Sequence, residues 1–338
     1  MSVRILRENA HLTYPHCSGF QGERILVSAH DPATGRDTGI DGVDGSVLWE
    51  QRGDAELVWF DCAGGLLATT AGGSLEVLNL SAVSPVPRVL FEAPEGSTLD
   101  GLLSVRPDGL AVAVVETTGE RRRLLEVDGA SGEVTERCAV GWWANHVAYS
   151  PFDPAWIGFA HEGPTLEVPD RMWAWHEGQG PAPFLDQHAI ADRPESFVAV
   201  GHERWLHHDL GAAVVAYGAS EAGPRGLYFA HPDGRPPRLV AAGERFWHCD
   251  VSRDGRFAVV DTKGPLDLPG GAWPDREPVV SDIVLIELST GERTRLARTH
   301  GHNHPKHPHP VFTPDGTSVL FNHTAEDRAT VSVASVRL

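Results

Sequence analysis

A turn that recurs along the whole chain is the feature that most constrains the fold. The turn closes on glycine, or once on proline, at successive intervals of 43, 44, 45, 57, 44 and 61 residues, and a short run rich in Val, Ile and Leu follows each one. Short β-runs joined by such turns, in units of roughly 40–50 residues, are typical of a propeller with four-stranded blades. The pattern predicts an all-β, seven-bladed β-propeller that occupies residues 1–338 as a single domain. The seven anchors are Gly22, Gly65, Gly109, Pro154, Gly211, Gly255 and Gly316.

The chemistry of the turns supports hairpins at these points. Three of them read Pro-Asp-Gly or Arg-Asp-Gly and end at Gly109, Gly255 and Gly316, and such residues favour tight connections between strands. The two long intervals predict loop insertions around residues 187–196 and 264–278. The β-like run 330–338 is expected to complete a blade, together with a strand from residues 3–6. An ordinary β-sandwich is the alternative, but the regular spacing favours the propeller.

Composition limits the classes of partner. A net charge of −18 argues against nucleic acid and anionic membranes, and a small anionic substrate would need local cations in its pocket. No apolar run of about eighteen residues and no apolar leader stands out, so we expect a soluble, cytoplasmic protein. The four cysteines are far apart, without a CxxC pair, which indicates neither a disulfide framework nor a cysteine zinc site.

Histidines gather near the C-terminus. Five of the chain's eighteen histidines lie within residues 300–309. Pro308 and Pro310 hold this segment extended and suit the entrance to a strand. In a strand, His307 and His309 would point to the same face and form half of a metal site. A solvated polar loop is the equally simple alternative.

Three histidines share one position relative to the turns. His146, His248 and His309 each lie four residues before the Ser or Thr that opens the next turn. His202 begins the matching strand of the fifth unit, with its register open by one residue. Equivalent positions on the innermost strands of a propeller face one another across the channel.

We therefore expect His248, His307 and His309 to hold a first-row divalent ion such as Mn, Fe, Ni or Zn. Counting does not settle which of His300, His302 and His304 adds a fourth ligand, and His304, the closest, is our choice. His146 and His202 should lie nearby. Satisfied core or rim histidines are the alternative reading. His161, Glu162 and Arg171 are further candidates, although a Glu162–Arg171 ion pair at the rim would explain two of them.

These segments resemble the oligogalacturonate lyases in residue type and order, over about residues 140–325. That family comprises seven-bladed propellers, largely intracellular, that use manganese and cleave short pectic uronides by β-elimination. The segments are His161-Glu162-Gly163-Pro164, Arg171-Met172-Trp173, Gly201-His202-Glu203-Arg204-Trp205, Trp247-His248 and His307-Pro308-His309-Pro310.

The resemblance implies roles for individual residues. The family's metal-binding histidines correspond to His248, His307 and His309, its catalytic base to His202, and its carboxylate-binding arginine to Arg171. The family's remaining ligand is a glutamine, and His304 occupies that position here. Four imidazoles would make a softer site than the family has, which leaves the identity of the metal open.

The implied chemistry agrees with the pattern of residues. A divalent cation and Arg171 would neutralise the uronate carboxylate while His202 removes the C5 proton, giving a 4,5-unsaturated product. No organic cofactor is implied. His146, His161 and Glu162 would hold sugar hydroxyls or water, and Lys306 is a possible second cation.

Two other functions remain open at this point. One is a non-catalytic propeller that binds partners, against which the convergent histidines argue. The other is a lactonase-type hydrolase, although such enzymes favour carboxylate and amide ligands for calcium. The sequence also leaves open which uronide is cleaved, and the oligomeric state.

Overall fold

The computed structural model describes residues 2–31, 33, 36–50, 59–71, 73–267, 280–300, 307–326 and 330–338. Within these ranges every regular element is a β-strand. No described residue belongs to a helix long and apolar enough to span a membrane. The chain divides into two units: an N-terminal unit (Leu12–Glu162 and Met172–Ala182) and a C-terminal unit (Met1–His11, Gly163–Arg171 and Pro183–Leu338).

The N-terminal unit contains four antiparallel sheets, in which strands consecutive in the chain lie side by side, except that the first two strands of the third sheet both pair with its third strand. In chain order the strands are β3 (Phe20–Gln21), β4 (Arg24–Asp31), β5 (Arg36–Asp41) and β6 (Val47–Glu50); β7 (Phe60–Ala63), β8 (Leu66–Ala71), β9 (Ser74–Asn79) and β10 (Arg88–Glu92); β11 (Ser97–Leu99), β12 (Ser104–Val105), β13 (Ala111–Thr118), β14 (Arg121–Asp128) and β15 (Val134–Val140); and β16 (Ala144–Tyr149), β17 (Trp156–His161), β18 (Met172–His176) and β19 (Gly180–Pro183).

The C-terminal unit contains three four-stranded sheets. The strands are β20 (Val200–Trp205), β21 (Ala212–Ala216), β22 (Gly226–Ala230) and β23 (Arg238–Ala242); β24 (Phe246–Val251), β25 (Phe257–Thr262), β26 (Ser281–Glu287) and β27 (Arg293–Thr299); and β28 (Val311–Phe312), β29 (Ser318–Thr324) and β30 (Val331–Arg337) with β1 (Val3–Glu8). The short strand β2 (Ala10–His11) follows β1. Five of the seven sheets have four strands, and the other two add a fifth short strand to a path of four. This confirms the predicted seven-bladed β-propeller, while the prediction of a single domain stays a prediction.

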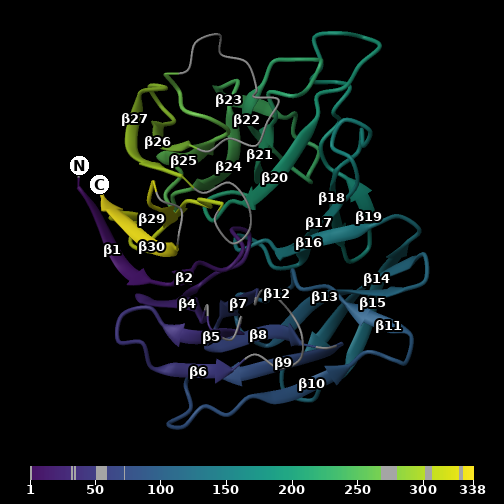
Figure 1. Ribbon diagram of the computed structural model, residues 1–338. Coiled ribbons are helices and arrows are strands. Elements are labelled where there is room, and N and C mark those ends of the chain that lie inside the picture. Colours follow the sequence, from purple (N-terminus) through teal and green to yellow (C-terminus); the bar gives the residue numbers. More distant parts are fainter. Residues whose placement is uncertain are drawn as a thin grey trace. The chain divides into compact units, whose positions relative to one another are not determined.

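The first strand of the chain completes the last sheet. Val3 pairs with Val336 and Glu8 with Ser332 in an antiparallel ladder, and Figure 1 shows purple β1 along yellow β30. The pairing protects the outer edge of β30, whose backbone groups would otherwise be exposed. This confirms the predicted partnership between the run 330–338 and a strand near residue 3.

All seven predicted turns join two paired antiparallel strands that are consecutive in the chain. In three of them the glycine N–H donates back to the residue three before it, at 2.7 Å for Gly109 and 2.8 Å for Gly255 and Gly316. These glycines have φ of 76°, 71° and 69°, a conformation that side chains with a Cβ rarely adopt. The local turn chemistry therefore explains why the repeat is legible in the sequence.

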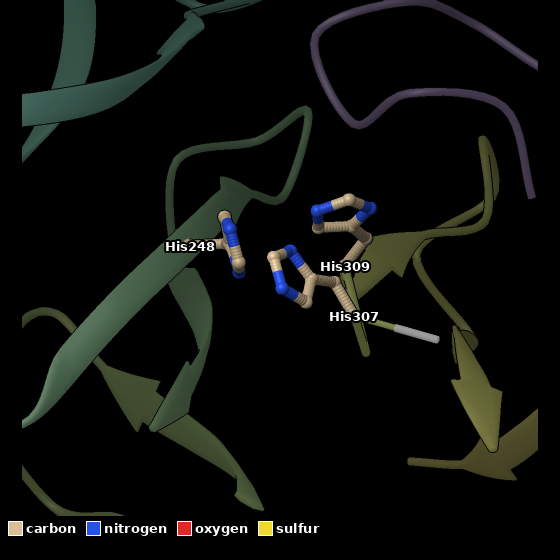
Figure 2. Close-up of side chains that lie close together, drawn as sticks. All are labelled: His248, His307 and His309. Carbon is tan, nitrogen blue, oxygen red and sulfur yellow. The ribbon is translucent and has the colours of Figure 1, made fainter. Parts of the chain in front are cut away.

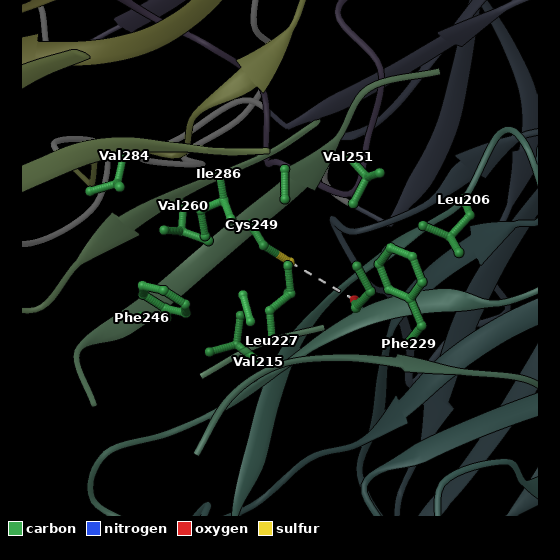
Figure 3. Close-up of a cluster of buried hydrophobic side chains, with 13 residues drawn as sticks. Leu206, Val215, Leu227, Phe229, Phe246, Cys249, Val251, Val260, Val284 and Ile286 are labelled. Carbon is green, nitrogen blue, oxygen red and sulfur yellow. Dashed lines mark hydrogen bonds between the residues drawn. The ribbon is translucent and has the colours of Figure 1, made fainter. Parts of the chain in front are cut away.

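Apolar side chains fill the spaces between successive sheets of each unit. In the C-terminal unit thirteen buried residues from the sheets β20–β23 and β24–β27 form one cluster, and Figure 3 shows Phe246 and Phe229 within it. Strand β21 is buried at all five of its positions, which is why it reads as a continuous apolar run. Truncation of a fully buried Phe such as Phe246 typically costs about 3–5 kcal/mol.

A repeated polar contact links neighbouring sheets within each unit. The carboxylate of Asp61 accepts the N–H of Val105 at 2.6 Å, and the carboxylate of Asp250 accepts the N–H of Phe312 at 2.8 Å. Burial raises the pKa of both carboxyls, although these hydrogen bonds oppose the change. The first bond ties β7 to β12 and the second ties β24 to β28, in each case a strand of one sheet to a strand of the next sheet along the chain.

Of the two predicted loop insertions, the structure describes the first in full and only part of the second. Residues 184–199 lie between β19 and β20 and contain no strand, as expected for a loop. Most of the second insertion, residues 268–279, lies outside the described residues.

Candidate metal centre

Four histidines occupy one structural position in their sheets. The first hairpin of each of these sheets is closed by a backbone hydrogen bond of 2.9–3.0 Å, donated by Ser150, Leu206, Ser252 or Thr313. The residues four positions before these donors are His146, His202, His248 and His309. The hydrogen bond at Leu206 settles the register of the irregular fifth turn, and His202 joins the set.

The backbone is irregular at each of these histidines. Register shifts interrupt the ladders beside His146, His202 and His248, and φ is positive at His146 (57°), His202 (40°) and His309 (45°). A bulge re-aims a side chain away from the alternation of a regular strand. Positive φ in a residue other than glycine is uncommon and is concentrated at functional sites.

Three of the C-terminal unit's histidines converge on one point. Ligand atoms of His248, His307 and His309 all lie within 4.8 Å of one another, and Figure 2 shows the three rings turned toward a common space. His248 and His309 are buried and His307 is half-buried. Three imidazole nitrogens at this separation could hold a first-row divalent ion and leave positions for substrate.

His202 lies beside this trio. Its ring centroid is 4.7 Å from that of His248, with the rings nearly perpendicular, and 6.2 Å from that of His309, with the rings nearly parallel. The side chain is 2% exposed. A fourth imidazole is therefore adjacent to the candidate ligands without belonging to the closest group.

The carboxylate of Asp261 determines how His248 presents its ring. The Nδ1 of His248 lies 2.8 Å from Oδ2 and 3.0 Å from Oδ1 of Asp261. A carboxylate only accepts hydrogen bonds, so Nδ1 carries the proton and donates it. The Nε2 atom of His248 is then left with the lone pair that a metal requires.

Asp261 also binds backbone from two sheets. Its Oδ1 accepts the N–H of His248 at 2.8 Å, and its Oδ2 accepts the N–H of His309 at 3.2 Å. The side chain is fully buried. Sequence reasoning missed this residue, although a lone acidic side chain within the apolar run of β25 was a usable signal, because a buried carboxylate needs partners.

An aromatic ring and a cation border the cluster. The Trp247 ring is stacked on His248, with centroids 4.8 Å apart, and its centroid is 4.5 Å from that of His307. The Nζ atom of Lys263 lies 5.7 Å from the centroid of Trp247. Lys263 and two of the candidate ligands thus lie against the same indole ring.

Arg171 is buried on the segment that precedes β18. Its backbone N–H donates to Oε1 of Gln187 at 2.7 Å, while Nε2 of Gln187 donates to the carbonyls of Val168 and Val198 at 3.1 and 3.0 Å. Gln187 is itself fully buried and clamps the Arg171 segment to the chain leading into β20. Arg171 is not a member of the group formed by His248, His307 and His309.

The other candidates lie in the N-terminal unit. The Nε2 atom of His146 lies 3.4 Å from Oε1 of Glu162 and 3.4 Å from the hydroxyl of Tyr14. The His161 ring packs against Trp142 at 4.3 Å. His146 is buried, and His161 and Glu162 are half-buried.

Two predicted residues, His304 and Lys306, lie outside the described residues.

The sequence predicted that His307 and His309 lie on one strand and point to the same face, and the structure differs from this. Strand β28 begins at Val311, so His307 and His309 precede it, and positive φ at His309 breaks strand alternation. Their rings nevertheless lie 5.4 Å apart, because local backbone geometry and not strand parity brings them together.

Comparison with known proteins gives a consistent picture. The sequence model of the oligogalacturonate lyase family matches residues 115–337. Oligogalacturonate lyase of Dickeya dadantii and oligogalacturonide lyase of Pectobacterium atrosepticum are 26% and 27% identical to this chain over 224 residues, which are 63% of this chain and 55% of each relative. The matched segment spans about half the length of these curated relatives.

Solved structures extend the similarity in fold to nearly the whole chain. Oligogalacturonate lyase of Vibrio parahaemolyticus is 19% identical with a TM-score of 0.79, covering 99% of this chain and 93% of its own. An oligogalacturonate lyase solved in complex with manganese is 21% identical with a TM-score of 0.78, covering 98% of this chain and 90% of its own. The fold is shared, and the family match covers well over half of the sequence: the chain belongs to the oligogalacturonate lyase family.

Proposed function

We propose that this chain is a metal-dependent lyase that cleaves short, oligogalacturonate-like uronides by β-elimination and leaves a 4,5-unsaturated sugar. The convergence of three imidazoles within 4.8 Å is the observation that carries the proposal. It lies inside the segment that the family model matches. A propeller that only binds partners needs no such cluster.

The donor set fits a first-row divalent cation. His248, His307 and His309 offer neutral nitrogen ligands, and the hydrogen bond from Nδ1 of His248 to Asp261 keeps Nε2 available. Manganese is our first choice because a solved relative carries it. When bound, the cation would offset the charge that develops on the substrate carboxylate.

His202 is proposed as the general base. The C5 proton of a uronate is α to a carboxylate, and a neutral imidazole can accept it as the bond to the C4 oxygen breaks. The ring of His202 lies 4.7 Å from that of His248, beside the candidate ligands and outside their closest group. This separation suits a residue that acts on the substrate while its neighbours hold the metal.

Cationic side chains would bind the anionic sugars. Arg171 is proposed to contact the carboxylate of the reacting residue, with its backbone held by Gln187. Lys263, whose ammonium group lies over the Trp247 ring, is a described cation, and Lys306 remains a sequence-based candidate. Local charges of this kind are required because the chain carries a net charge of −18.

The remaining proposed contacts rest on the sequence pattern and on side-chain chemistry. His146, His161 and Glu162 are proposed to hold sugar hydroxyls or ordered water. The support is their chemistry: His146 and Glu162 already form a polar pair at 3.4 Å, and His161 lies against an indole ring. Combined polar groups and aromatic faces suit carbohydrate binding.

The decisive experiment is a turnover assay with digalacturonate and added manganese. The unsaturated product absorbs in the ultraviolet, so absorbance should rise, and a chelator should abolish the rise. A panel of galacturonate and glucuronate oligosaccharides would then identify the substrate. Binding of uronides without any product would favour the non-catalytic module instead.

A further inference from the structure

We infer that Asp261 is the positioning residue that assembles the metal centre from two separate sheets. The inference rests on the proposed function in one respect, because it assumes that His248 and His309 are metal ligands. It concerns what one buried carboxylate does to both of them.

The hydrogen bonds of Asp261 reach two ligands that are far apart in the chain. It accepts the ring Nδ1–H of His248 at 2.8 Å, the backbone N–H of His248 at 2.8 Å, and the backbone N–H of His309 at 3.2 Å. His248 lies on β24 and His309 precedes β28, in a neighbouring sheet. A single side chain thus sets the position of one ligand's ring and of the other ligand's backbone.

The contact with His248 selects one tautomer. Imidazole in water favours neither nitrogen strongly, and the wrong tautomer would turn N–H toward the metal. A carboxylate at Nδ1 keeps the proton there and makes Nε2 a better donor. Complete burial of Asp261 strengthens this control, since no water competes for its oxygens.

The contact with His309 holds a strained backbone. His309 has φ of 45°, a conformation that costs free energy and persists only where the surroundings enforce it. The hydrogen bond from its N–H to Asp261 is one such restraint. Removal of the carboxylate should therefore loosen the ring of His248 and the main chain of His309 together.

The test compares Asp261→Asn with Asp250→Asn. Asp250 is also a buried carboxylate, and it accepts the N–H of Phe312 and the side chain of Arg204 without contacting a candidate ligand ring. Manganese affinity, measured by titration of metal-free protein, should fall by about 10–100-fold for Asp261→Asn. For the Asp250→Asn control it should change by less than about threefold.

A second measurement tests the tautomer directly, first in the unmodified protein and then in Asp261→Asn. In metal-free protein, nitrogen NMR should show the His248 ring protonated at Nδ1, with the signal assigned by comparison with His248→Gln. In Asp261→Asn the Nε2–H form should become populated. A rigid Nε2–H ring in the unmodified protein, or an unchanged manganese affinity in Asp261→Asn, would overturn the inference.

These readouts separate the inference from the proposed function. If no uronide is cleaved but the affinity and tautomer effects are found, Asp261 organises a metal site with another use. If the unmodified protein binds no first-row metal, the proposed function fails, and the NMR measurement still decides whether Asp261 sets the ring of His248.

Discussion

The backbone N–H of His309 donates to the carboxylate of Asp261 at 3.2 Å, across 48 residues of chain. The same carboxylate holds the ring of His248. Two of the three convergent histidines are therefore tied to each other through one buried side chain. Their geometry depends on the pairing of sheets and not on their own sequence neighbours.

Separate roles for His307 and His202 can be tested with two alanine variants. His307→Ala should lose both bound metal and turnover, because it removes one of three nitrogen ligands. His202→Ala should keep the metal but lose about 10²–10⁴-fold in kcat, the usual contribution of a general base. Metal analysis and steady-state kinetics give both readouts. His188→Ala, at an exposed histidine of the same unit, should change neither, and metal retained by His307→Ala would contradict the ligand assignment.

Gln187 should matter through the segment that it holds. Gln187→Ala removes hydrogen bonds to the backbone of Arg171, Val168 and Val198 and leaves buried polar groups unpaired. We expect a loss of about 1–3 kcal/mol in the free energy of unfolding, and a KM that rises more than kcat falls. Urea unfolding and substrate titrations measure these effects. Gln179→Ala, at an exposed turn, is the matched control; equal KM values for the two variants would disprove a role in positioning Arg171.

Lys263 should contribute to binding of the anionic substrate. Lys263→Met keeps much of the packing against Trp247 but removes the charge, so KM should rise about tenfold, the effect of roughly 1.5 kcal/mol lost from one charge-assisted contact. The metal content should stay the same. Kinetics at several salt concentrations provide the check, because Lys263→Arg should keep the salt dependence of KM that Lys263→Met loses. Unaltered KM in Lys263→Met would remove this lysine from the site.

The half-buried His207 should make the protein sensitive to acid. Burial, reinforced by Arg204 and Arg253, lowers the pKa of His207 to about 3 from its ordinary value of 6.5. Between these two values the unfolded chain binds a proton that the folded chain does not, so stability falls as the pH drops below 6.5. The loss from this group between pH 7 and pH 5 is about 2 kcal/mol. Urea unfolding at both pH values should show a smaller drop for His207→Gln than for the unmodified protein, and identical drops would exclude His207 as the cause.

Local patterns in the sequence were enough to predict the architecture and part of the candidate site. The Asp-Gly turns at Gly109, Gly255 and Gly316 act within four residues, so their spacing could be read directly and predicted seven sheets of four strands. Histidines that lie at the same distance before those turns, such as His248 and His309, could be predicted for the same reason. In a repeat fold, equivalent positions in the sequence occupy equivalent positions in the structure. The family assignment, confirmed by the match over residues 115–337, likewise rests on contiguous motifs.

Only the tertiary structure decided how those residues are held. The register shift beside His202, the positive φ of His309, and the partners of Asp261 and Gln187 arise where one strand or loop meets another far away in the chain. The alternation of apolar residues and the spacing of turns describe one strand at a time. They do not reveal where a bulge forms or which N–H groups donate to a buried carboxylate. Those features are set by the requirement that every buried polar group find a partner once the sheets have packed.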